Sequence, residues 1–83
     1  MKKYNLMGIV IENRRELAPF VQEILTSFGC IIKTRIGLHE GTEEECSNEG
    51  FIILTLKNDE EEIKKLISKL KNIDTVRVKN VEI

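Results

Sequence analysis

Residues 8–38 read GIVIENRRELAPFVQEILTSFGCIIKTRIGL, and this stretch decides the fold. Its start belongs to an apolar, β-branched run, residues 4–11, which predicts a strand. That run is apolar on both faces, a pattern typical of a central strand that is covered on both sides. After polar residues 12–15, apolar residues recur at helical spacing over 17–28 and predict a helix. Residues 30–38 predict a second strand.

Several residues carry local expectations in this half of the chain. Pro19 is expected in the opening turn of the helix, where its missing N–H costs least. Gly29 is expected to end the helix in the left-handed conformation, and Cys30 to be a small core residue. The second strand is expected to alternate without interruption, with the even-numbered residues from Ile32 to Leu38 on one face.

The second half of the chain repeats the strand and helix signals. Residues 39–50 predict a polar connection, and residues 51–57 predict a third strand that is again apolar on both faces. The second helix is expected to begin at Asn58. Glu61 follows three residues later, which is the spacing of a capping box.

The last strand is expected over residues 75–82, with a bulge or strand end at Asn80 and Val81, where the apolar alternation slips. The resulting order is strand, helix, strand, strand, helix, strand, which is two copies of one unit. It predicts a single α+β domain, residues 1–83, with the ferredoxin-like βαββαβ fold. Its two helices would cover one face of a four-stranded antiparallel sheet whose first and third strands are central.

The uncovered sheet face predicts assembly. Both central strands are apolar on both faces, so several apolar side chains must point away from the helices. These are drawn from Met7, Ile9, Ile11, Phe51, Ile52, Ile53 and Leu54. A contiguous apolar patch of this kind marks an interface, so we expect a homo-oligomer, either a dimer or a tetramer.

Composition excludes some classes of function. The 83 residues carry a formal net charge of -1, which gives no long-range attraction to nucleic acid, so direct binding of DNA or RNA by this domain is not expected. No stretch approaches the roughly 20 apolar residues that cross a bilayer, so no membrane insertion is expected. Two cysteines outside any metal-binding spacing favour a reducing, cytoplasmic location.

Two polar segments are candidates for a ligand site. Asn13, Arg14 and Arg15 connect the first strand to the first helix, where helix N–H groups and a guanidinium can hold a carboxylate or a phosphate. Arg35 and Gly37 end the second strand, where a glycine allows close approach of a ligand. The alternative is a helix N-terminus with solvated arginines.

Metal binding and catalysis receive less support from the sequence. His39 is the only histidine, and together with Cys46 it could form part of a metal site; the alternative is an exposed loop histidine. No catalytic set or cofactor-binding motif is present, so we expect no enzyme activity and no resident cofactor. Acylphosphatases share the predicted topology, but their glycine-rich loop is missing.

The first half of the chain resembles the family of proposed regulators of the iron-only hydrogenase system. The resemblance rests on a Gly-Ile-Val-Ile strand, an acidic-polar-Arg turn, an apolar helix segment, a glycine, and a second strand ending in Arg-hydrophobic-Gly. Here these are Gly8–Ile11, Glu12–Arg15, Val21–Leu25, Gly29 and Arg35–Gly37. The second half, residues 51–79, resembles the family in pattern more than in residues.

This resemblance implies an ACT-like form of the ferredoxin-like fold, related to the C-terminal domain of the nickel-responsive repressor, and a non-enzymatic role in transcriptional regulation. ACT domains often hold an amino acid at a subunit interface near the first strand–helix turn, a site that would involve Asn13 and Arg14 here. The repressor domain is a tetramer that binds nickel through histidines and a cysteine. Nickel sensing is therefore the alternative function, although this chain has one histidine.

Overall fold

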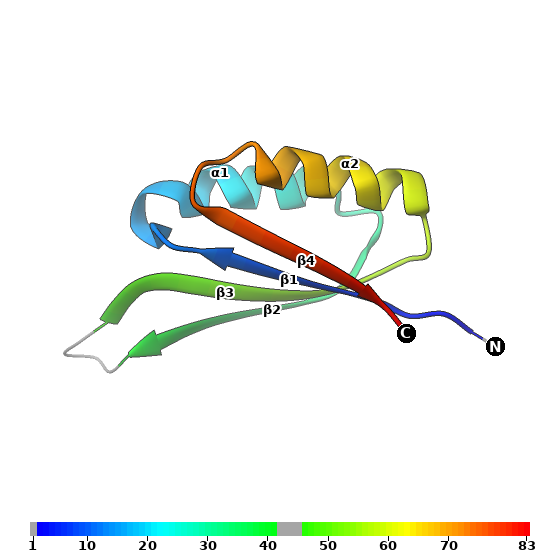
Figure 1. Ribbon diagram of the computed structural model, residues 1–83, viewed down its shortest axis with the longest axis horizontal. Coiled ribbons are helices and arrows are strands. Elements are labelled where there is room, and N and C mark those ends of the chain that lie inside the picture. The colour runs from blue at the N-terminus through cyan, green and yellow to red at the C-terminus, as the bar shows by residue number, and fades with distance from the viewer. Residues whose placement is uncertain (1, 42–45) are drawn as a thin grey trace.

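A computed structural model describes residues 2–41 and 46–83 of the chain, and the side chains of residues 2–37 and 49–83. Six elements follow one another along the chain. They are β1 (Asn5–Ile11), α1 (Arg14–Ser27), β2 (Ile32–Gly41), β3 (Cys46–Leu56), α2 (Glu60–Lys71) and β4 (Val76–Glu82) (Figure 1). The predicted βαββαβ order is confirmed.

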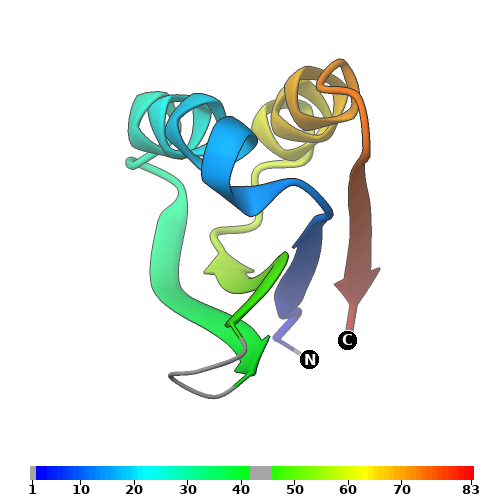
Figure 2. The same ribbon diagram turned by 90° about the vertical axis from the view of Figure 1, so that its left-hand side faces the viewer.

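The four strands form one antiparallel sheet in the order β2-β3-β1-β4, so β1 and β3 are central, as predicted. Both helices lie on the same face of the sheet (Figures 1 and 2). We call the opposite face of the sheet the open face. The ends of β2 and β3 that are joined by their connection diverge from α1, as Figure 1 shows.

The core fills the space between the helices and the sheet. Alternate residues of β1 point into it, and Met7 and Ile9 are completely buried. The remaining core side chains are Ile11, Val21, Leu25, Phe28, Ile31, Ile52, Leu54, Leu56, Ile63, Leu66, Leu70 and Val76. Packing of the apolar sides of the two helices against one face of the sheet is the main favourable contribution to folding for a domain of this kind.

The β2–β3 pair differs from the expected register. Ile32 lies opposite Leu56 and Thr34 lies opposite Thr55, so Lys33 is an extra residue in β2. This irregularity places Ile32 on the helix side and Thr34 on the open side, so the expectation that the even-numbered residues share one face is wrong for Ile32. Both strands also run further into residues 39–50 than predicted, because pairing continues to Gly41 opposite Cys46.

Helix α1 corrects three local predictions. It begins at Arg14, because the amide of Leu17 donates to the carbonyl of Asn13 at 2.9 Å, and Pro19 therefore lies in the second turn instead of the first. Gly29 does not adopt the left-handed conformation. Its amide donates to the Thr26 carbonyl, and an added Cβ would lie 3.2 Å from that oxygen. Cys30 is exposed and is not a core residue.

The N-cap of helix α2 lies one residue later than predicted. Its N-cap is Asp59, whose carboxylate accepts a hydrogen bond from the Glu62 amide at 3.2 Å. Asn58 is not the cap, because its side chain has other partners. The amide group of Asn58 donates to the Lys3 carbonyl at 3.0 Å and accepts from Asn5 at 2.7 Å.

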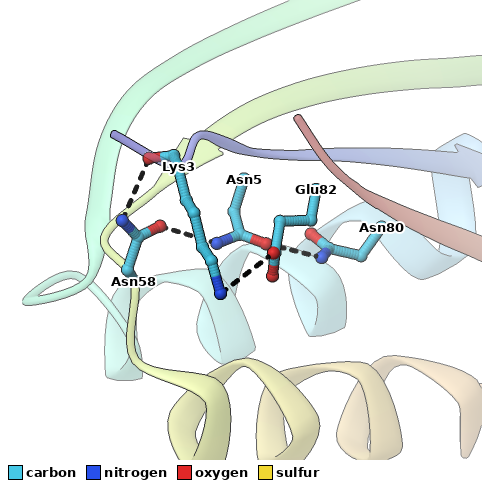
Figure 3. A network of polar contacts seen from close by, with 5 residues as sticks. All are labelled: Lys3, Asn5, Asn58, Asn80 and Glu82. Carbon is cyan, nitrogen blue, oxygen red and sulfur yellow. Dashed lines mark hydrogen bonds and ion pairs between the residues drawn. The ribbon is translucent and has the colours of Figure 1, made fainter. Parts of the chain in front are cut away.

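Three asparagines join β1, β4 and the start of α2 (Figure 3). Asn5, which is 5% exposed, donates to Asn58 and accepts from the Nδ2 atom of Asn80 at 3.0 Å. Beside them, Lys3 and Glu82 form an ion pair at 3.4 Å. The β1–β4 register continues through Asn80 to Glu82 without a shift, so the prediction of a bulge or a strand end at Asn80 and Val81 is wrong. Asn80 occupies an inward position, where its Nδ2 atom donates to Asn5 and its Oδ1 atom is buried without a partner in the described part of the chain.

Replacement of Asn5 by alanine is expected to lower the free energy of unfolding by about 1–2 kcal/mol, because it removes two part-buried hydrogen bonds and leaves polar atoms of Asn58 and Asn80 without their partner. Urea denaturation measures this loss. Asn72→Ala, at an exposed helix end, is the matched control and should change stability by less than about 0.5 kcal/mol. Equal effects of the two substitutions would contradict the role given to the asparagine cluster.

Thr75 is the one non-glycine residue with positive φ in the described part of the chain, at 66°. A β-branched side chain is strained in this region, so Thr75→Gly is expected to raise the free energy of unfolding by up to about 1 kcal/mol. Thermal denaturation monitored by circular dichroism measures the gain. The control is Asn72→Gly, at φ -73°, where no strain is relieved and stability should not rise.

Candidate functional site

A pocket of about 170 Å³ lies between the first half of α1 and the strands β2 and β3. These strands diverge from the helix toward their connected ends (Figure 2). The pocket lining combines a cation, an amide, two glycines and an apolar floor. The lining residues are Ile11, Arg14, Ala18, Gln22, Gly37, Gly50, Phe51 and Ile52. We call it the Arg14 pocket.

Arg14 is placed by its packing on a glycine. It is the first residue of α1, and its side chain is half-buried. A Cβ atom added at Gly50 would lie 3.0 Å from Cδ and 3.3 Å from Cγ of Arg14. The aliphatic stem of Arg14 therefore fills the space that a side chain at position 50 would occupy, and it holds the guanidinium at the pocket.

Gly37 forms the opposite wall of the Arg14 pocket. It pairs with Ile52, whose side chain is buried under the helices, so position 37 also faces the helix side of the sheet. A Cβ atom added at Gly37 would meet no atom of the described residues within 4 Å. The glycine thus leaves room in the pocket and leaves the backbone of β2 accessible to a ligand.

The chemistry of the pocket suits a small anion with a compact apolar part. Arg14 supplies a planar cation that can hold a carboxylate or phosphate through two hydrogen bonds, and Gln22 supplies an amide donor and acceptor. Ile11, Ala18 and Ile52 supply apolar surface. A volume of about 170 Å³ is below the range of pockets for drug-sized ligands, so the site fits a small metabolite or one part of a larger one.

The five ligand-binding residues predicted from the sequence lie in different places. Arg14 and Gly37, which are far apart in the chain, line the same pocket. Arg15 lines a shallower surface hollow that adjoins it along α1. Asn13 precedes α1 and donates from Nδ2 to Glu16 at 3.0 Å, and Arg35 is exposed on β2, outside the lining of the Arg14 pocket.

Sequence reasoning missed Gln22 and Gly50 as members of the site. Gln22 sits beside the apolar stripe of a helix and gives no signal of its own. Gly50 begins the apolar segment of β3, and a glycine at that position indicates close approach of another group, which here is the stem of Arg14.

The metal-site hypothesis concerned His39 and Cys46. The backbone register places His39 opposite Gly50 and Cys46 opposite Gly41, but both side chains lie outside the described residues. Among the side chains that are described, no group of three His, Cys, Asp or Glu residues could hold a metal ion. The hypothesis stays a prediction.

A family model described as iron-only hydrogenase system regulator, TM1266-like, matches residues 3–80; that role is a provisional assignment. The solved structure of the uncharacterized protein TM1266 from Thermotoga maritima has 36% identity and a TM-score of 0.81, with 99% of each chain covered. The chain belongs to the TM1266-like family. The resemblance to this family that the sequence predicted is confirmed. No curated protein matches the chain.

More distant relatives of this TM1266-like chain share its fold. CPII, a nitrogen regulatory PII-like protein from Thiomonas intermedia K12 solved with ADP, AMP and bicarbonate, has 15% identity and a TM-score of 0.61 over 99% of this chain and 96% of its own. The ACT domain from GTP pyrophosphokinase of Chlorobium tepidum has 14% identity and a TM-score of 0.66, with 94% and 96% covered. The ferredoxin-type fold is thus the ACT-like and PII-like one.

In the part of the chain that the structure describes, neither helix has the length and apolar character needed to cross a membrane.

The two pocket glycines should respond differently to alanine. Gly50→Ala is expected to lower the free energy of unfolding by about 1 kcal/mol, because its Cβ would press on the stem of Arg14. Gly37→Ala, the matched control on the facing strand, should be neutral or stabilising by about 0.5 kcal/mol, because its Cβ enters open space. Urea denaturation of both variants checks the pair, and a larger loss at Gly37 would contradict the described packing.

Proposed function

We propose that this chain is a non-enzymatic regulatory domain that binds a small anionic effector in the Arg14 pocket. One observation carries the proposal. Arg14, Gln22 and the open wall at Gly37 line the same pocket, and the floor of that pocket is apolar. Membership of a family described as regulators, and a fold shared with ACT and PII-like proteins, support a regulatory role.

The size and chemistry of the pocket favour an effector no larger than an amino acid. A carboxylate on Arg14 with a short aliphatic part over Ile11 and Ile52 would use both kinds of surface present. The PII-like protein CPII was solved with bicarbonate and acetate as well as with ADP and AMP. Small carboxylates and adenine nucleotides are therefore the two classes to compare.

Self-association and a cytoplasmic location complete the proposal. We expect a dimer or tetramer, because apolar side chains on the open face, among them Leu6, Ile36 and Val81, are well exposed in a single copy. Cys30 is an exposed free thiol, which suits a reducing compartment. The regulated process would be the iron-only hydrogenase system, as the family description has it.

Thermal denaturation with a panel of ligands tests effector binding. The panel contains the twenty L-amino acids, acetate, bicarbonate, AMP and ADP. A ligand at 100 times its dissociation constant stabilises the fold by about 2.7 kcal/mol, and each kcal/mol raises the midpoint of a domain this size by about 4–8 °C. We expect a shift of this order for a small carboxylate.

Two arginine variants identify the site of any such shift. Arg14→Ala should abolish the shift, because it removes the cation of the pocket. Arg35→Ala is the matched control, since this exposed arginine lies outside the pocket lining, and it should retain the full shift. A shift that survives in Arg14→Ala, or that disappears in Arg35→Ala, would contradict the assignment.

A further inference from the structure

The open face of the sheet presents a continuous apolar surface built by all four strands. Side chains from β1 and β3 occupy its middle, and those from β2 and β4 extend it to both edges. Its apolar members are Leu6, Val10, Ile36, Phe51, Ile53 and Val81. Several are large and 39–48% exposed, which places this face among the patches that mark an interface.

The open face is not flat. Gly8 lies on this face, and a Cβ atom added there would lie 3.6 Å from two atoms of the Phe51 ring, so the ring leans over the glycine. Beside the ring is a recess of about 230 Å³ that Leu6, Ile53 and Val81 also line. A half-exposed aromatic ring next to an apolar recess on one surface suits contact between two identical faces.

The dimensions of the face fit a second copy of this chain. Four strands of about seven residues span about 19 by 23 Å, so two facing sheets cover about 870 Å² before side-chain relief is counted. This lies in the smallest class of protein interfaces, which are weak and transient. Two basic residues of this face, Arg77 and Lys79, belong to the edge strand β4. Arg77 pairs with Glu12 at 3.4 Å, and Lys79 borders the recess beside Phe51.

Phe51 also belongs to the Arg14 pocket, whose lining includes Phe51 and its neighbour Gly50. The backbone at Gly50 is in contact range of the Arg14 stem on the helix side, and the next residue carries its ring on the open face. A molecule that fills the pocket would touch Gly50 and Phe51 directly and so restrict the position of the Phe51 ring. An interface residue that is ordered in advance loses less conformational freedom on association.

We propose that two copies of this chain associate through the open face, and that Phe51 couples this association to occupancy of the Arg14 pocket. The coupling of association to the pocket rests on the proposed function. Occupancy of the pocket tightens association, and association favours binding in the pocket by the same factor. A weak interface is one that a small change of this kind can control.

Sedimentation equilibrium from micromolar to millimolar protein tests the interface. Val81→Lys, at the edge of the open face, should weaken association at least about tenfold, because it places a charge in an apolar contact. Phe20→Lys is the matched control. Phe20 is an exposed apolar residue, 58% accessible, on α1 and away from the open face, and its replacement should leave the dissociation constant unchanged. A wild-type protein that stays monomeric at millimolar concentration, or equal effects of both variants, would overturn the interface.

Substitutions at Gly37 test the coupling without an identified effector. Gly37→Leu fills the pocket from its open wall, whereas Gly37→Ala adds a single methyl group and is the control. We expect Gly37→Leu to associate about fivefold or more tightly than Gly37→Ala. Equal or weaker association would overturn the coupling alone. Effector binding itself is judged by the Arg14→Ala and Arg35→Ala melting shifts, so the two proposals fail separately.

Discussion

Two helices can cover only one face of a four-stranded sheet, and most features of this protein follow from that limit. Strands β1 and β3 are central and carry apolar side chains on both faces. On the helix side these side chains are buried, with Met7, Ile9 and Leu54 completely inaccessible. On the other side the same strands present Leu6 and Phe51 to solvent. The alternation of a strand thus supplies the core and the apolar open face from the same two strands.

The Arg14 pocket arises because helix and sheet do not stay in contact along their full length. Strands β2 and β3 extend beyond the helices and diverge from α1 (Figure 1). Two glycines then decide the shape of the space. Gly50 admits the stem of Arg14, and Gly37 leaves the opposite wall empty. A polar head over an apolar floor is the usual composition of a small-molecule site.

Relatives with the same fold differ in nearly all their residues, since the ACT and PII-like structures share only 14–15% identity with this chain. A fold of this kind hosts many functions, and function resides in the site that each chain builds on it. In this chain the proposed site combines an arginine at the first turn of α1 with β-strand glycines, and β3 connects that site to the open face. A regulatory domain needs such a connection between a ligand and an assembly.

Apolar periodicity alone determined the element order, the central position of β1 and β3, and the apolar character of the open face, because these depend on patterns local to each element. The family followed from the residues of the first strand, turn and helix. Tertiary structure decided the rest. Lys33 shifts the β2 register, Asn5 accepts a hydrogen bond from Asn80 at an inward position of a regular strand, and only folding brings Arg14 beside Gly37. Each of these depends on partners distant in sequence, which no local pattern encodes.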